Sequence, residues 1–192
     1  YAHDVPPLAR RVGRAPASIA HAGWLELDFK RAPTHRTSRS TALKTALELA
    51  RGILEAQPFS RLLGTQMTAY GEAGVELRLV LTDDLRQQHG FAHGGVLAYL
   101  ADNALTFAGG FAMGGGVLTA DLKLNYVRPA IGQVLIARAT TVSAGKTQAV
   151  CRGEVIALND GVEKVCVIAQ GMVLRAAQAP SSAAPTPRED RA

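Results

Sequence analysis

Cysteine is scarce in this chain, since Cys151 and Cys166 are the only two among 192 residues. Both stand in apolar runs rich in β-formers, where a buried, reduced thiol is the usual occupant. A scaffold held together by several disulfides is excluded, and a reducing, cytoplasmic location is expected. A single disulfide stays open only if the two residues lie opposite each other on paired strands.

Other features that define large classes of protein are missing. No apolar run approaches the ~20 residues needed to cross a bilayer, and the first residues contain no signal-peptide core, so no membrane partner is expected. The five histidines are dispersed, and no cysteine or carboxylate pair stands at ligand spacing with them, so we expect no metal site. The phosphate-binding loop Gly-x-x-x-x-Gly-Lys-Ser/Thr and the serine elbow are also absent.

The net charge of +5 comes from one end of the chain. Residues 1–44 hold eight basic and three acidic residues, whereas the remainder carries 13 of each sign. A basic arm without interleaved aromatics is more typical of a solvated tail than of a nucleic-acid reader, so no nucleic-acid partner is expected. We predict a disordered basic extension over 1–40, one domain over 41–177 and a disordered Ala/Pro/Ser-rich tail over 178–192.

Hydrophobic periodicity divides the domain into helices and strands. Apolar residues recur at helical spacing from Ser40 or Thr41 until Pro58, and again over 94–108, where Gly109-Gly110 is expected to end the helix. Alternation predicts strands at 65–69, 75–81, 118–127, 134–142, 148–158 and 163–175. This order implies an α+β fold, a curved antiparallel sheet of about six strands around one long central helix. The uncovered sheet edge and helix rim predict at least a dimer.

The most informative stretch is a glycine-rich turn, His89-Gly90-Phe91-Ala92-His93-Gly94-Gly95, which runs directly into the second helix. Two glycines at a helix start let a ligand oxygen approach bare backbone N–H groups at the positive end of the helix dipole. Asp102 lies eight residues after Gly94 among apolar neighbours. The sequence therefore predicts an oxyanion site followed, about two turns later, by a buried lone carboxylate.

Four segments carry a family resemblance. They are Pro58-Phe59-Ser60-Arg61-Leu62-Leu63-Gly64, Gln87-Gln88-His89-Gly90-Phe91-Ala92-His93-Gly94-Gly95, Leu100-Ala101-Asp102-Asn103-Ala104, and Asp121-Leu122-Lys123-Leu124-Asn125-Tyr126-Val127-Arg128-Pro129-Ala130 leading to Gly132. In this order and spacing they resemble the hotdog-fold acyl-CoA thioesterases of the PaaI type. The resemblance covers roughly Leu43 to Arg175 and implies thioester hydrolysis with no cofactor, because coenzyme A is part of the substrate.

Position by position, the resemblance implies five catalytic residues. The Gly94 N–H polarises the thioester carbonyl, and Asp102 acts as general base on water or attacks directly as nucleophile. In this family the two groups typically come from opposite subunits, which implies a homodimer or homotetramer with active sites at the interface. Gln87 replaces the Asn of many relatives but matches related aryl-CoA thioesterases, as does Thr106. Thr119 stands where some relatives place a Ser that positions water or the thioester.

The remaining candidates are substrate-binding residues, each with a plainer reading. His93 either transfers a proton or fixes the turn by a local hydrogen bond, and Gly95 either donates to substrate or permits close packing. His89 either borders the substrate mouth or belongs to the loop. Phe91 either forms a wall of the acyl pocket or packs in the hydrophobic core. Arg128 is the first candidate for attracting the coenzyme A phosphates.

The function expected from these residues is hydrolysis of an aryl- or medium-chain acyl-CoA thioester. Two other functions stay open. A hotdog enoyl-CoA hydratase or dehydratase would need a second acid-base partner for Asp102, and none is convincingly placed. A non-catalytic acyl-CoA-binding sensor would use the basic extension for another contact.

Overall fold

A computed structural model describes residues 39–176, so the predicted tail and all but the last two residues of the predicted extension lie outside the described residues. Helix α1 (Arg39–Ala56) ends just before Pro58, as the periodicity predicts, and Pro58 begins the short helix α2 (Pro58–Leu63). Proline suits a first helical position because its missing N–H has no helical partner there. Gly64 closes α2 in the left-handed conformation, with φ of 70°.

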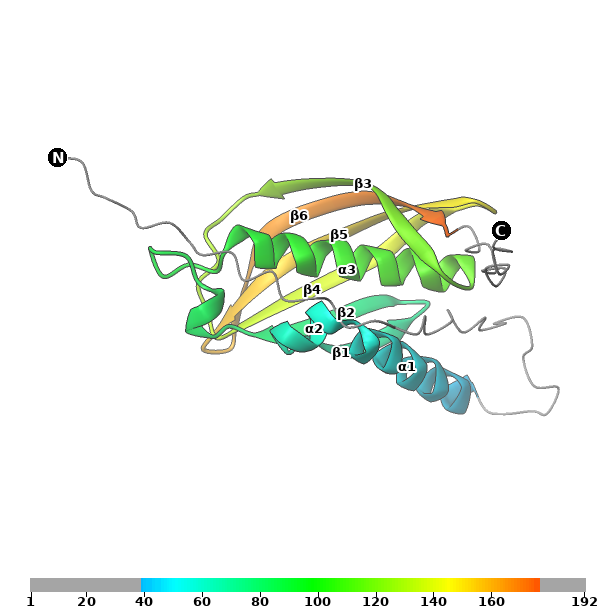
Figure 1. Ribbon diagram of the computed structural model, residues 1–192, viewed down its shortest axis with the longest axis horizontal. Helices are drawn as coiled ribbons and strands as arrows, with labels where there is room; N and C mark the ends of the chain where they lie inside the picture. The colour runs from blue at the N-terminus through cyan, green and yellow to red at the C-terminus, as the bar shows by residue number, and fades with distance from the viewer. Residues whose placement is uncertain (1–38, 177–192) are drawn as a thin grey trace, which may run out of the picture.

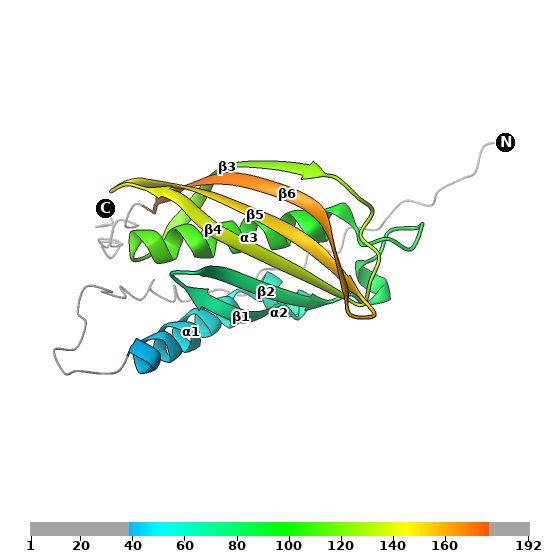
Figure 2. The same ribbon diagram turned by 180° about the vertical axis from the view of Figure 1, so that it is seen from behind.

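The predicted sheet of six antiparallel strands is confirmed, and its strand order is β1-β2-β4-β5-β6-β3. The sheet curves behind the long helix α3 in Figure 1 and in front of it in Figure 2, as in the hotdog fold. It therefore covers one side of α3 and leaves the other without a second layer of strands. The strands are β1 (Gln66–Gly71), β2 (Gly74–Val80), β3 (Val117–Tyr126), β4 (Val134–Ala144), β5 (Gln148–Asn159) and β6 (Val162–Arg175).

Helix α3 (Gly94–Met113) is the centre of the fold, and it is longer than the sequence predicts. Gly109-Gly110 does not end it, so that expectation is wrong. A Cβ at Gly109 would overlap the side chain of Val173 and approach Cys151 Sγ at 3.2 Å, so this glycine permits close contact with the sheet. The helix ends instead at Gly114, whose φ of 69° places it in the left-handed region.

Its length changes one further expectation. By length and composition alone α3 could cross a bilayer, so the expectation that no segment is long and apolar enough is wrong for this helix. Half of the most apolar 18-residue stretch of α3 is buried inside the protein. The fully buried Leu100 and Leu105 pack in one core with sheet residues such as Leu77 and Leu135.

The two cysteines lie on neighbouring strands, Cys151 on β5 and Cys166 on β6, and both are buried free thiols. Cys151 stands opposite Gly171 rather than Cys166, so the register keeps the two sulfur atoms from pairing. Burial raises the pKa of each thiol. The prediction of two buried cysteines without a disulfide between them is therefore confirmed.

Strand β3 is an open edge of the sheet and is exposed along most of its length. Leu118 keeps 59% of its surface exposed. Tyr126 keeps 53%, although its hydroxyl reaches the start of α3. The opposite edge, β1, is packed against α1 (Figure 1). The dimer expected from the sequence stays a prediction, and β3 with the uncovered side of α3 is the surface available for it.

Candidate active site

The N-terminus of α3 has one free backbone donor. An α-helix leaves its first four N–H groups without helical partners. Here the Gly95 N–H donates to Nδ1 of the capping residue His93 at 3.0 Å, and the N–H groups of Val96 and Leu97 donate to the His93 carbonyl. No acceptor within the described residues bonds the Gly94 N–H. The turn therefore presents Gly94 as the donor available to a ligand, as the sequence predicts for an oxyanion site.

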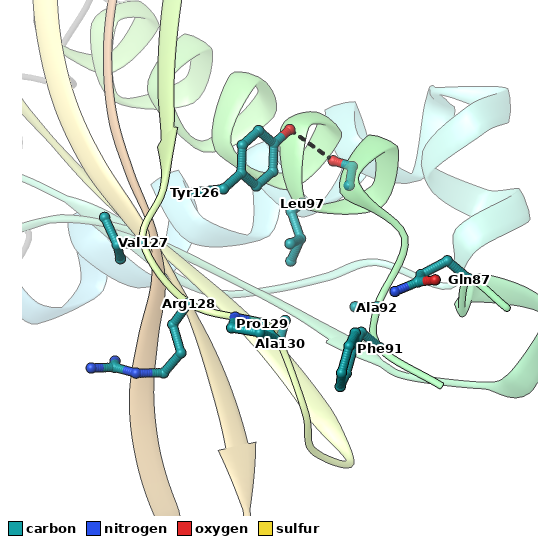
Figure 3. Close-up of a pocket in the computed structure, with 10 residues that line it drawn as sticks. Gln87, Phe91, Ala92, Leu97, Tyr126, Val127, Arg128, Pro129 and Ala130 are labelled. Atoms are coloured by element: carbon teal, nitrogen blue, oxygen red, sulfur yellow. Dashed lines mark hydrogen bonds between the residues drawn. The ribbon is translucent and has the colours of Figure 1, made fainter. Parts of the chain in front are cut away.

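Gly94 opens onto a cavity of about 320 Å³. Its polar side chains are Gln87, Tyr126 and Arg128, and the rest of its lining is apolar or glycine. Figure 3 shows the cavity between the turn before α3 and the chain that leaves β3. Because the φ of Gly94 is not positive, its backbone conformation does not require glycine. The lining residues are Gln87, Phe91, Ala92, Gly94, Leu97 and Tyr126, followed by residues 127–130.

The loop before the turn holds Gln87 and Phe91 against this cavity. The Gln87 N–H donates to the Phe91 carbonyl at 2.8 Å, and the Gly90 N–H donates to the Gln87 carbonyl at 2.9 Å. The side-chain Oε1 of Gln87 accepts from the His89 N–H at 3.0 Å, so this oxygen is already partnered. His89 itself is exposed and does not line the cavity, so the structure does not bring its side chain to the site.

Asp102, Thr106 and Thr119 meet at a second place, between α3 and the edge strand β3. Thr119 donates its hydroxyl to Asp102 Oδ1 at 2.7 Å, a short bond of the kind made to a carboxylate. The Thr106 hydroxyl lies 2.9 Å from both the Asp102 carbonyl oxygen and the Thr119 hydroxyl. The structure thus joins three residues that the sequence could associate only through the resemblance.

The register of β3 explains how Thr119 reaches Asp102. The pairing of β3 with β6 shifts between Thr119 and Asp121, next to the hydroxyl that contacts the helix. Such bulges redirect a side chain and are common beside active sites. Asp102 is half-buried rather than fully buried, which corrects the burial expected from its apolar neighbours. Those neighbours pack in the core, while Asp102 faces Thr119 on the edge strand β3.

The two groups of the predicted mechanism are separated within one chain. Asp102 does not line the cavity at Gly94. Eight residues along a helix correspond to about 12 Å, so the carboxylate and the Gly94 N–H of one chain do not converge on one atom. A complete site of the kind implied by the resemblance would need a second chain.

Arg128 lines the cavity and is exposed. Its Nη1 donates to the Val165 carbonyl at 2.6 Å, and Figure 3 shows its guanidinium pointing away from Gln87 and Phe91. No carboxylate within residues 39–176 forms an ion pair with it. The positive charge of Arg128 therefore lies beside the cavity and is not neutralised by a carboxylate of the described residues.

Sequence reasoning missed Tyr126, whose hydroxyl donates to the Gly94 carbonyl at 3.1 Å. It also did not single out Val127, Pro129 and Ala130 as cavity residues. All four stand in the last segment of the family resemblance, within two residues of Arg128, so that segment was the available signal. Their role becomes visible only when the end of β3 lies beside the start of α3.

A third polar cluster belongs to the scaffold. Tyr99 and Asn103, on α3, share hydrogen bonds of 2.7 to 3.3 Å with Ser60 of α2 and with the neighbouring Gln57 and Thr65. These bonds fix α2 against α3 and account for the Ser60 and Asn103 positions of the resemblance. In the described part of the chain no three His, Cys, Asp or Glu side chains form a group that could hold a metal ion.

Comparison with known proteins supports the fold and the family. The family model described as "Thioesterase superfamily" matches residues 89–164, which include the glycine turn, α3 and most of the strands that follow. A curated Haemophilus influenzae protein, an esterase by name, is 31% identical over 86 residues. The match spans 44% of this chain and 62% of that protein, less than two thirds of its length.

Solved structures extend the similarity over the described domain. A thioesterase family protein from Silicibacter pomeroyi is 30% identical with a TM-score of 0.62, and the match covers 65% of this chain and 93% of that one. A variant of the phenylacetic acid degradation protein PaaI from Thermus thermophilus is 29% identical with a TM-score of 0.55, over 62% of this chain and 100% of its own. With its six-stranded sheet wrapped around α3 and this similarity, the chain belongs to the thioesterase superfamily and has the hotdog fold.

Proposed function

We propose that this protein hydrolyses the thioester of an aryl- or medium-chain acyl-CoA. The observation that carries the proposal is the Gly94 N–H, the free donor at the start of α3, which belongs to a residue that lines a largely apolar cavity. A thioester is already activated, so hydrolysis requires little more than a polarised carbonyl and a correctly placed nucleophile. The aromatic rings of Phe91 and Tyr126 beside the cavity suit an aryl or alkyl acyl-CoA.

The Gly94 N–H stabilises the negative charge that develops on the carbonyl oxygen. A prepared donor at a helix N-terminus costs no reorganisation when that charge appears, and removing such a donor typically lowers kcat about 100- to 1000-fold. Gly95 cannot share this role as found, because its N–H is bonded to His93. His93 accordingly fixes the turn rather than transferring a proton.

Asp102 supplies the nucleophile in one of two ways. As general base it takes a proton from water, the hydroxide adds to the carbonyl carbon, and the tetrahedral intermediate expels coenzyme A thiolate, which recovers the proton. As nucleophile it displaces coenzyme A thiolate from the acyl carbon and forms a mixed anhydride, which water then hydrolyses to the free acid and the original carboxylate. The short reach of an aspartate favours the base route. Thr119 occupies only Oδ1 of the carboxylate, which leaves Oδ2 for a water molecule.

Thr119 and Thr106 then hold the carboxylate. The short bond from Thr119 to Oδ1 supports an orienting role in place of direct contact with water or the thioester. Thr106 is bonded to the Asp102 carbonyl and to Thr119, so it supports this arrangement from the helix. An acid-base partner of the kind a hydratase needs is absent from this cluster among the described residues.

A second copy of the chain completes the site. Within one chain the Gly94 N–H and the Asp102 carboxylate lie about 12 Å apart along α3. The uncovered side of α3 and the exposed strand β3 are the surfaces that a partner would cover, which would bring its Asp102 to the cavity beside Gly94. Arg128 would lie near the mouth, where it attracts the phosphates of coenzyme A.

The test is thiol release from phenylacetyl-CoA, benzoyl-CoA and a series of straight-chain acyl-CoA thioesters. Asp102→Asn should keep the fold and lower kcat at least about 100-fold, because it removes the base. Glu48→Gln, at an exposed carboxylate on α1 beside the opposite edge of the sheet, is the control and should leave kcat unchanged. Acyl-CoA binding without thiol release would indicate a sensor, and addition of water to crotonyl-CoA would indicate a hydratase.

A further inference from the structure

Tyr126 stands at the end of β3, where its side chain crosses to the first turn of α3. Its hydroxyl donates to the Gly94 carbonyl at 3.1 Å, the dashed line in Figure 3. Two of its ring carbons and its hydroxyl oxygen lie 3.7 to 3.8 Å from the position that a Cβ on Gly94 would occupy. The ring keeps 53% of its surface, so it forms a wall of the cavity and does not belong to the core.

The two side chains that contact this turn hold the same peptide group. The Gly94 carbonyl, which accepts from Tyr126, and the Gly95 N–H, which donates to His93, belong to one planar unit. Side chains from opposite directions therefore fix both polar ends of that plane. Gly94 joins it to the preceding plane, which carries the free N–H together with the His93 carbonyl that accepts from Val96 and Leu97. The angle between the two planes is set at Gly94, and glycine is the residue that restricts this joint least.

We propose that Tyr126 is a positioning residue that holds the direction of the Gly94 N–H, an inference that rests on the proposed function of this donor. The Tyr126 hydroxyl already donates its proton to the Gly94 carbonyl. Tyr126 therefore acts through Gly94 and does not donate a proton to the substrate. A small error in the direction of an oxyanion donor affects the transition state more than the bound substrate. The role should therefore appear in kcat and not in KM.

The experiment compares Tyr126→Phe with Tyr99→Phe. Both changes remove one hydroxyl, but the Tyr99 hydroxyl belongs to the scaffold cluster with Ser60 and Thr65. Tyr126→Phe should lower kcat about 3- to 10-fold, the value of one hydrogen bond, with KM unchanged. It should also speed hydrogen exchange at the Gly95 amide, measured by NMR. Tyr99→Phe should lower Tm and leave kcat and the Gly95 exchange rate unchanged.

A third variant separates the ring from the hydroxyl. Tyr126→Ala also removes the wall of the cavity, so KM should rise in addition to the fall in kcat. Wild-type kcat and unchanged Gly95 exchange in Tyr126→Phe would overturn the proposal, and so would equal losses in both Phe variants. If the wild type released no thiol, the proposed function would fail, and exchange at Gly95 would still decide whether Tyr126 holds the turn.

Discussion

Replacing Gly94 with alanine should separate stability from activity. The φ of Gly94 is not positive, so alanine can adopt its backbone conformation. The added Cβ would lie 3.7 to 3.8 Å from the ring edge and hydroxyl of Tyr126, which is ordinary van der Waals contact. Gly→Ala at a compatible site stabilises a protein by about 0.4–1 kcal/mol, because the unfolded chain loses freedom. For a chain of this size, Tm should rise by roughly 1–4 °C.

Activity should fall in the same variant. The methyl group projects from Gly94 towards Tyr126, on the cavity side of the turn. A carbonyl oxygen must come within about 2.7–3.1 Å of the N–H to be stabilised, and a methyl group beside that N–H hinders the approach. Complete loss of an oxyanion donor lowers kcat about 100- to 1000-fold, so we expect a fall in kcat/KM of at least about tenfold.

Gly52→Ala is the matched control. Gly52 lies in α1, is exposed, and has no heavy atom within 4 Å of a built Cβ. Alanine there should stabilise the helix by up to about 1 kcal/mol and leave turnover unchanged. The assay is calorimetric Tm with steady-state thiol release for both variants. Full kcat/KM in Gly94→Ala would refute the oxyanion role, and a large fall in its Tm would refute the packing argument.

Three other predictions concern the carboxylate, the assembly and the cysteines. Thr119→Val removes the donor to Asp102 and should lower kcat about 3- to 10-fold, whereas Thr119→Ser should restore it; equal rates for both would exclude the orienting role. Random pairing of equal amounts of Gly94→Ala and Asp102→Asn chains should regain about a quarter of wild-type activity in a dimer, because half the dimers hold one intact site. No recovery on mixing would place both groups in one chain. Cys151 and Cys166 are fully buried with raised thiol pKa values, so neither should form a thiolate at neutral pH. A disulfide reagent should therefore titrate them only after unfolding, and rapid reaction in the native protein would contradict their burial.

The strands were predictable because their signal is local. Alternation of apolar and polar residues placed β4 at 134–142, where the structure has Val134–Ala144, and placed the other strands within about two residues of their observed ends. The end of α3 was not predictable in this way. Gly109 reads as a helix end in the sequence, whereas its role is to admit Val173 and Cys151, which stand on distant strands.

In the candidate site, too, some features follow from the local sequence and others from contacts between distant segments. The order of residues in the chain is enough to place the Gly94 turn before a helix and Asp102 two turns later, because helix geometry depends on near neighbours. The bond from Thr119 to Asp102 and that from Tyr126 to Gly94 depend on the path of β3, which returns to α3 only when the sheet has formed. Periodicity and turn chemistry by themselves determined the elements and the helix-start donor. Tertiary packing decided which side chains reach these groups, since contacts between distant segments leave no local pattern.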